Sequence, residues 1–357
     1  MSRPAQAVLD LSAIAHNLTR VRELAPGRSI MAVIKANAYG HGMIKAANAL
    51  READAFAVAC LDEALILREA GFAHPIVLLE GFFSAAEFPL LSRHHLITVV
   101  HHEEQLIMLE RAKLGAPLPV WIKVDSGMHR LGLAPDQVAA AWRRLNACGS
   151  VHVLGFMSHL ANADDRNDPM TLQQQSCFSQ AVGDYPGLRS IANSAAILTW
   201  PQTHGDWVRP GLMLYGVSPF ADRVGENHGL QAAMSLQSQL MAVNRFKRGD
   251  RIGYGGEWEC PEDMPVGVVA IGYGDGYPRH AKSGTPVLVN NKRVPLIGRV
   301  SMDMICVDLR NQPQARSGDP VCLWGAALPV EEIARYAGTI PYELLCRVTS
   351  RVRVHAE

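Results

Sequence analysis

Ala32-Val33-Ile34-Lys35-Ala36-Asn37-Ala38-Tyr39-Gly40-His41-Gly42 is the stretch that indicates the fold most directly. Residues 30–34 form a short apolar run, typical of a buried strand, and the run ends at Lys35. Small residues, an aromatic residue and a Gly-His-Gly turn follow at once. Lys35 is therefore expected at the carboxyl end of a strand, facing a loop, where α/β folds place their catalytic groups.

The position of Lys35 allows two interpretations. A lysine amine surrounded by apolar neighbours can lose its proton near neutral pH and attack a carbonyl carbon, which would make Lys35 a candidate for a Schiff base. A lone lysine is more often an exposed side chain whose stem lies along the surface. The lysine alone leaves both interpretations open, and the remainder of the chain has to separate them.

Apolar segments recur along the first two thirds of the chain, with helix-like spacers such as residues 62–70 and 103–114 between them. Eight strand–helix units within roughly 220 residues are what a (β/α)8 TIM-like barrel requires. The eight expected strands are residues 30–34, 56–60, 76–79, 96–100, 120–124, 151–157, 189–192 and 212–215.

The composition of the chain changes after residue 219. Residues 220–229 are polar and contain glycine, as a linker would, and short β-like runs follow with many Gly and Pro turns and one expected helix at 330–337. We therefore expect a barrel at 1–228 and a mostly β domain at 229–357. The extreme N-terminal strand, near Val8, is a candidate to pack with the second domain. The expected strands of that domain are residues 236–243, 266–271, 286–289, 304–308 and 321–324.

Composition excludes several classes of function. The 357 residues include 34 basic and 34 acidic side chains, so there is no basic excess for binding nucleic acid or an anionic membrane surface. The seven cysteines contain no CxxC pair and indicate reduced thiols, and with no signal peptide and no membrane span the expected location is cytoplasmic. The run His101-His102-Glu103-Glu104 has the side chains of a metal site, but consecutive residues at a helix start point in different directions, so no metal is expected.

Several separated motifs resemble one family. Residues 32–42 resemble the pyridoxal-phosphate attachment motif of alanine racemases, a fold type III family, in which the lysine holds the cofactor as a Schiff base. Residues 125–132 (Asp-Ser-Gly-Met-His-Arg-Leu-Gly), 206–211 (Asp-Trp-Val-Arg-Pro-Gly) and 251–256 (Arg-Ile-Gly-Tyr-Gly-Gly) also match that family's motifs. The resemblance extends from Val8 to about Arg351, in the family's order, and implies pyridoxal 5'-phosphate as the cofactor.

The resemblance implies roles for residues in the barrel. The cofactor would be held by side chains and backbone groups at strand ends, and Arg130 would lie near the substrate carboxylate, oriented by Lys123, which is carbamylated in many relatives. For binding the cofactor, the resemblance implies Lys35, His159 and Arg209. Residue type and position add as candidates the polar pair Asn193 and Ser194, the backbone of Gly211 and Leu212, and the phenols of Tyr39 and Tyr342, each of which could also be an ordinary turn or core residue.

By this resemblance, Arg209 would determine how strongly the cofactor ring withdraws electrons. In the family it faces the pyridine nitrogen and is hydrogen-bonded by the residue corresponding to His159. Because a guanidinium can only donate hydrogen bonds, it keeps that nitrogen unprotonated and weakens the ring as an electron sink. Rapid return of a proton to Cα, and therefore racemisation, is favoured over transamination.

The second domain would supply the other proton-transfer group. Racemisation removes a proton from one face of Cα and delivers one to the other, and the resemblance implies that Lys35 and Tyr254 serve the two faces. Tyr254 would belong to the site of the partner subunit, so a homodimer with shared active sites is implied. Tyr273, Met302 and Asp303 would line the partner's site, and a tight pocket bounded by Tyr254, Tyr273 and Met302 would suit the methyl group of alanine.

The resulting prediction is an alanine racemase that interconverts L-alanine and D-alanine, either for peptidoglycan precursors or for alanine catabolism. A broader-specificity racemase or an amino-acid decarboxylase of the same fold is the nearest alternative. A decarboxylase would be expected to have a carboxylate in place of Arg209. A non-catalytic pyridoxal-phosphate carrier is a third interpretation, and the domain that contains Tyr254 argues against it.

Overall fold

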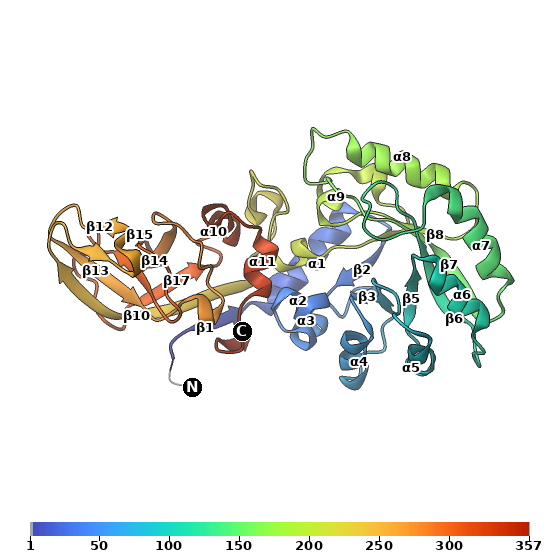
Figure 1. The fold of residues 1–357 in the computed structure, drawn as a ribbon, viewed down its shortest axis with the longest axis horizontal. Helices are drawn as coiled ribbons and strands as arrows, with labels where there is room; N and C mark the ends of the chain where they lie inside the picture. Colours follow the sequence, from blue (N-terminus) through green and yellow to red (C-terminus); the bar gives the residue numbers. More distant parts are fainter. Residues whose placement is uncertain (1–2, 357) are drawn as a thin grey trace. The chain divides into compact units, whose positions relative to one another are not determined.

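The computed structural model describes residues 3–356, so residues 1–2 and 357, the outer ends of the two expected domains, lie outside the described part. The chain divides into two compact units. We call the first the barrel unit, formed by residues 17–38 and 42–214, and the second the β unit, formed by the residues up to His16, Tyr39–His41 and the residues from Tyr215 onward. Figure 1 shows both units.

The barrel unit contains eight parallel strands in the order β8-β7-β6-β5-β4-β3-β2-β9. All residues of β3 and β4 are buried, which explains why these strands are continuous apolar runs instead of alternating patterns. The strands are β2 (Ser29–Val33), β3 (Ala55–Val58), β4 (Ile76–Leu78), β5 (Ile97–Val100), β6 (Leu118–Lys123), β7 (Val151–Met157), β8 (Leu188–Ser190) and β9 (Trp207–Val208).

Strand β9 closes the barrel. It pairs with β2, and on its other side the Asp206 N–H donates to the carbonyl of Arg189 at 2.9 Å and the Arg209 N–H to that of Ala192 at 2.9 Å. The expected eighth strand at 212–215 was wrong, because these residues form the 3-10 turn η4 (Leu212–Tyr215). Pro210 lacks an N–H and cannot continue a strand ladder, so the strand ends before it.

Helices follow the strands and surround them in the view of Figure 1. They are α1 (Leu11–Leu24), α2 (Lys35–Tyr39), α3 (Met43–Ala49), α4 (Leu61–Glu69), α5 (Phe88–Arg93), α6 (Glu103–Arg111), α7 (Val138–Ala147), α8 (Met170–Val182) and α9 (Ser194–Thr199). Short 3-10 turns are η1 (Ala85–Glu87), η2 (Pro135–Gln137) and η3 (Pro201–Thr203). A (β/α)8 barrel followed by a mostly β domain is confirmed as the fold class.

The β unit is built on an eight-stranded sheet in the order β13-β16-β15-β14-β17-β10-β1-β18. Its strands are β1 (Gln6–Leu9), β10 (Met234–Phe246), β13 (Met264–Val269), β14 (Pro286–Val289), β15 (Lys292–Ile297), β16 (Ile305–Asp308), β17 (Pro320–Trp324) and β18 (Arg353–Ala356). A small ribbon pairs β11 (Arg251–Ile252) with β12 (Trp258–Glu259), and the helical segments are α10 (Val330–Ala337), α11 (Pro341–Cys346), η5 (Gly225–His228), η6 (Tyr254–Gly256) and η7 (Tyr273–Asp275).

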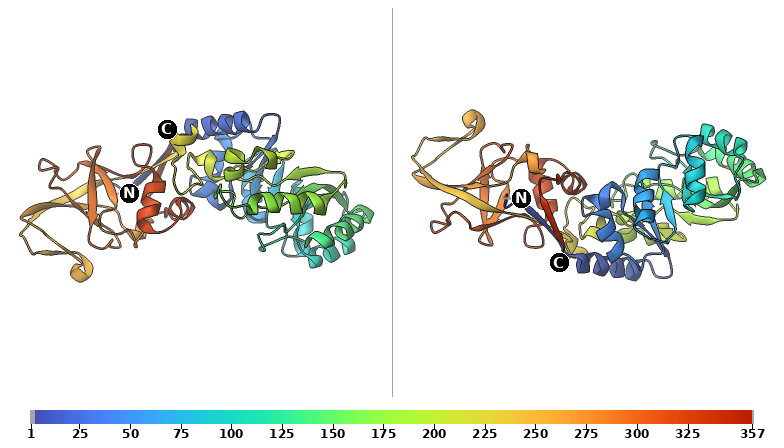
Figure 2. Two further views of the ribbon diagram at one scale, coloured as in Figure 1. Left: turned by 90° about the horizontal axis from the view of Figure 1, so that it is seen from above. Right: turned by 90° about the horizontal axis from the view of Figure 1, so that it is seen from below.

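The first strand joins this second sheet. β1 pairs antiparallel with β10 and parallel with β18, so the first and last strands of the chain lie side by side in one sheet (Figure 2). The alternation of half-buried and buried residues in β1 matches a strand with one covered face.

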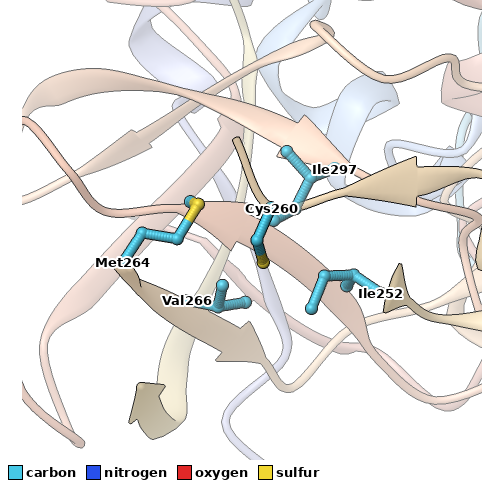
Figure 3. Packing of buried hydrophobic residues seen from close by; sticks show 5 residues of the cluster. All are labelled: Ile252, Cys260, Met264, Val266 and Ile297. Carbon is cyan, nitrogen blue, oxygen red and sulfur yellow. The ribbon is translucent and has the colours of Figure 1, made fainter. Parts of the chain in front are cut away.

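A small apolar cluster supports the ribbon of β11 and β12. Figure 3 shows the side chains of Ile252, Cys260, Met264, Val266 and Ile297 directed toward one another, and each is at most 4% exposed. Burial of Ile252 therefore fixes the start of the turn that carries the next residues of the chain, η6.

Candidate active site

Lys35 follows β2, from which Ile34 separates it, and begins an unusual turn. The four residues after it, which complete α2, all have positive φ between 52° and 55°. A left-handed turn costs about 1–2 kcal/mol for each residue that has a Cβ atom, so other contacts must hold it. Asn37 supplies two of them: its Oδ1 accepts the Met43 N–H at 2.8 Å, and its carbonyl accepts the Gly42 N–H at 2.9 Å.

Glu63 of α4 provides a second support for this turn. One carboxylate oxygen accepts the Ala36 N–H at 2.7 Å, and the other accepts the Ala59 N–H at 2.7 Å. The carboxylate thus ties the residue after Lys35 to the end of β3. Strain of this kind is characteristic of functional sites that are over-determined by their surroundings.

Basic side chains gather at the same end of the barrel strands. Lys123 is the last residue of β6, His159 follows β7, and Arg209 follows β9. Lys123, His159 and Arg130 line one hollow of the barrel unit. Lys35 and Arg209 lie close enough to raise the cost of positive charge on Lys123 and His159. The barrel unit therefore brings five of the expected site residues together.

Charge repulsion and burial shift the protonation of this cluster. Burial, followed by Arg209 and Arg130, lowers the pKa of Lys123 to about 8, while Glu80 acts in the opposite direction. The same causes hold the pKa of His159 well below its usual value, so its imidazole is neutral near pH 7. A group of cations with so little opposing carboxylate is suited to an anionic ligand such as a phosphate ester or an amino-acid carboxylate.

Arg209 is 5% exposed, and the sheet fixes its guanidinium. One terminal nitrogen donates to the Ser190 hydroxyl at 2.6 Å, and the other donates to the carbonyls of Ser158 at 2.5 Å and Ile191 at 3.4 Å. Burial lowers its pKa to about 10, which still leaves it charged at neutral pH. Within residues 3–356 its partners are these oxygens, and the His159 ring is not hydrogen-bonded to it.

Asn193, Ser194 and Gly211 form a small donor site beside Arg209. Asn193 caps α9 through its Oδ1, and Ser194 Oγ accepts the N–H groups of Gly211 at 2.9 Å and Met213 at 3.4 Å. Because the two lone pairs of the hydroxyl are used, its hydrogen remains to donate to an anion. The Gly211 amide therefore orients Ser194, and Leu212 follows as the first residue of η4.

Tyr39 and Tyr342 belong to an aromatic group in the β unit. The Tyr39 ring lies 4.9 Å from that of Tyr215 and 5.9 Å from that of Tyr342, and His41 stacks on Tyr215 at 4.5 Å. Burial, with Tyr342 and Cys346 nearby, raises the pKa of Tyr39 far above its usual value. Its phenol thus stays protonated and can donate a hydrogen bond.

The remaining expected site residues lie in loops of the β unit with their side chains outward. Tyr254 begins η6 and is 67% exposed, Met302 is 52% exposed and Tyr273 is 37% exposed. The Asp303 carboxylate is partly exposed beside Arg351. These four side chains are therefore accessible from outside the described chain.

Sequence reasoning missed several supporting residues. Ser158 and Ser190, which accept from Arg209, and Glu63, which supports the turn after Lys35, were not singled out. Ser158 stands next to His159 in the chain, so a search for polar residues at strand ends could have found it. Tyr215 was assigned to a strand and for that reason was not considered as a ring beside Tyr39.

Comparisons with known proteins give consistent matches along the chain. Residues 9–219 match the family model for the alanine racemase N-terminal domain, and residues 233–356 match the model for the C-terminal domain. The chain is 58% identical to the alanine racemase of Nitrosococcus oceani, covering 97% of this chain and 98% of that protein. It is 53% identical to the biosynthetic alanine racemase of Escherichia coli K12, with 98% of each chain covered.

A solved structure gives the same result. The crystal structure of the biosynthetic alanine racemase from Pseudomonas aeruginosa matches with a TM-score of 0.97 at 48% identity, covering 99% of both chains. In the described part of our chain, none of the helices has the length and apolar character needed to cross a membrane.

Proposed function

The chain belongs to the alanine racemase family, and from this premise we propose that it interconverts L-alanine and D-alanine with pyridoxal 5'-phosphate as its cofactor. The observation that supports this most strongly is the cluster of Lys35, Lys123, Arg130 and Arg209 at one end of the barrel strands. These cations suit a phosphorylated cofactor and a carboxylate substrate together. The names of the relatives reported above favour alanine over the substrates of a broader racemase, and Arg209 argues against a decarboxylase.

The residues present fit the cofactor. Lys35 would hold its carbonyl carbon, Arg209 would face the pyridine nitrogen, and His159 would lie beside the ring. Ser194, oriented by Gly211, would donate to the phosphate, with Asn193 and Leu212 shaping that end. Tyr39 and Tyr342 would add phenolic donors, because burial keeps the Tyr39 hydroxyl protonated.

The chemistry requires two proton carriers. When bound, pyridoxal phosphate withdraws electrons from Cα and makes its hydrogen acidic. Lys35 would move a proton at one face of Cα, and the Tyr254 hydroxyl would move one at the opposite face. Arg209 has only hydrogen-bond donors, so beside the ring nitrogen of the bound cofactor it would limit electron withdrawal and favour return of the proton to Cα.

Arg130 and Lys123 would orient the substrate. Arg130 would bind the substrate carboxylate. Because the pKa of Lys123 is lowered to about 8, part of its amine is neutral near pH 7 and can add to carbon dioxide, losing one proton as the N–C bond forms. The resulting carbamate anion would offset the surrounding cations and fix Arg130.

We propose a homodimer because the β-unit residues of the site are turned outward. Tyr254, Tyr273, Met302 and Asp303 would complete the site of the partner subunit. The proposed setting is the cytoplasm, where D-alanine would serve peptidoglycan precursors, in keeping with relatives named biosynthetic.

The test of this function measures the exchange of the Cα hydrogen and the inversion of configuration in one experiment. The protein with pyridoxal phosphate and L-alanine in D2O should form D-alanine that carries deuterium at Cα, as measured by chiral chromatography and mass spectrometry. Lys35→Ala should abolish both signals, and Tyr254→Phe should lower them by a factor of about 100 or more. Release of carbon dioxide from the amino acid would contradict the proposal. So would a protein that shows the absorbance of bound cofactor but exchanges no deuterium at Cα of alanine.

A further inference from the structure

The loops that carry Tyr273 and Met302 form one hydrogen-bonded platform in the β unit. The Tyr273 N–H donates to the carbonyl of Ser301 at 3.0 Å, and the Gly274 N–H donates to that of Met302 at 2.9 Å. Tyr273 and Met302 are both exposed on this platform. The spacing of their side chains thus depends on how firmly the two loops are held together.

Asp275, beneath this platform, has a carboxylate that is fully buried. Its Oδ2 accepts the Gly272 N–H at 3.0 Å and Arg3 at 2.7 Å, while Arg351 Nε lies 3.4 Å from its Oδ1. A carboxylate that is removed from water requires such cationic partners. These two arginines come from opposite ends of the chain, beside β1 and β18.

The same two arginines also bind Asp303, which follows Met302. Arg351 donates to the Asp303 carboxylate at 2.5 Å, and Arg3 donates to the Asp303 backbone carbonyl at 3.1 Å. Each arginine therefore bridges one residue of the Tyr273 loop and one of the Met302 loop. We call Arg3, Asp275, Asp303 and Arg351 the arginine clamp.

The backbone packs directly against the clamp. A Cβ atom at Gly274 would overlap the Arg351 guanidinium and lie 3.0 Å from the Met302 carbonyl oxygen. Thr349, two residues before Arg351, donates through its hydroxyl to the Gly274 carbonyl at 3.0 Å and through its N–H to the Asp275 carbonyl at 3.2 Å. A shift of Arg351 would thus move the loop that carries Tyr273.

We propose that Arg3 and Arg351 are positioning residues that set the spacing of Tyr273 and Met302, and thereby the size limit for the substrate side chain. The inference rests on the proposed function, because it takes Tyr273 and Met302 as walls of the substrate pocket. Neither arginine needs to touch the substrate. A pocket wall that yields by a fraction of an ångström admits a larger side chain at a small cost, whereas a rigid wall rejects it.

The first test compares two substrates in matched variants. Arg351→Met removes the ion pairs of this residue with Asp275 and Asp303. Arg351→Lys keeps the positive charge but not the forked geometry of the guanidinium. Arg293→Met is the control, because Arg293 pairs with Glu332 at 2.6 Å in the same unit and, within residues 3–356, forms no hydrogen bond or ion pair with the clamp residues. Racemisation of L-alanine and L-serine gives kcat and KM for each protein.

Both Arg351 variants should raise the ratio of kcat/KM for serine to that for alanine by about fivefold, whereas Arg293→Met should leave the ratio unchanged. A general loss of stability would lower both activities together and leave the ratio at its original value. A ratio within about twofold of the unmodified protein in both Arg351 variants would overturn the proposal. If Arg351→Met does not fold, Arg351→Lys decides the outcome.

A second measurement separates the clamp from the proposed function. Hydrogen–deuterium exchange of residues 272–276 and 301–304 reports the hydrogen bonds between the loops without any turnover. Exchange should be faster in Arg351→Met than in Arg293→Met, and equal exchange would show that the clamp does not hold the loops. If exchange is faster in Arg351→Met but the unmodified protein does not racemise alanine, the clamp holds the two loops and the proposed function is wrong.

Discussion

At the scale of single residues, Lys123 is a side chain whose protonation is changed by its surroundings. It is 9% exposed, at the end of β6, among cationic neighbours. Its pKa falls from 10.5 to about 8, mainly through burial and then through Arg209 and Arg130. Protonated Lys123 thus destabilises the folded protein, and this cost disappears when the amine becomes neutral.

This shift predicts how stability depends on pH. Below about pH 8 the lysine is protonated in both the folded and the unfolded chain. Between about pH 8 and 10.5 the folded chain loses the proton while the unfolded chain keeps it, so stability rises with pH. The gain from Lys123 should approach roughly 3 kcal/mol over this range. Lys123→Met should lack it.

The measurement is urea unfolding of both proteins in buffer free of carbon dioxide, at about pH 7.5 and about pH 10. The difference between the two proteins isolates Lys123 from the other lysines and tyrosines that titrate. Parallel pH profiles would contradict the lowered pKa. Added 13C-bicarbonate should give a carbamate carbon signal in the unmodified protein that is missing from Lys123→Met.

The position of Lys35 at a strand end could be predicted from the apolar run before it, whereas Arg209 was identified only by its motif, because the strand before it, β9, was not predicted. The partners of Arg209 could not, because the hydroxyl of Ser190 and the carbonyl of Ser158 meet the guanidinium only when three neighbouring strands are side by side. The left-handed turn after Lys35 could not be predicted from the sequence either. Its alanines have no intrinsic preference for positive φ, so tertiary contacts impose it.

At the scale of elements, the start of α4 supports the turn that follows β2. Glu63→Ala would remove the acceptor for both the Ala36 and the Ala59 N–H groups. It should lower the free energy of unfolding by about 2 kcal/mol and reduce kcat, because the residues beside Lys35 lose a fixed position. Urea unfolding and steady-state kinetics measure the two effects.

Glu69→Ala is the matched control, since Glu69 is exposed at the far end of the same helix. It should change stability by less than about 0.5 kcal/mol. Glu63→Gln, which retains one acceptor oxygen, should fall between the two. If Glu63→Ala were as stable and as active as Glu69→Ala, the proposed support of the lysine turn would be wrong.

The sequence predicted some elements well and others poorly. α10 was predicted with its observed bounds because Pro329 precedes it, Gly338 follows it, and its apolar residues repeat at helical spacing. β15 was missed because Lys292, Arg293 and Pro295 interrupt its apolar pattern. The eighth barrel strand was placed after Pro210 because the apolar run at 212–215 outweighed the proline as a signal.

At the scale of the whole molecule, the chain supplies two sets of site residues that belong to different compact units. The barrel unit has Lys35 and the cationic cluster, whereas Tyr254 and Met302 project from loops of the β unit into solvent. The change of composition along the sequence predicted two domains, with the boundary placed at residues 228–229. Which subunit receives Tyr254 depends on an assembly that single-chain patterns do not encode, and the proposal of a shared site rests on family membership and on the exposed side chains.

Hybrid dimers test the shared two-base site most directly. The Lys35→Ala and Tyr254→Phe proteins, each with little or no activity by itself, are mixed so that their dimers exchange subunits. Native mass spectrometry verifies that hybrid dimers form. A shared site predicts that half of the dimers are hybrids with one intact site, so activity should rise to about a quarter of the unmodified level. Activity that stays at the sum of the two separate variants, despite verified hybrids, would contradict the account.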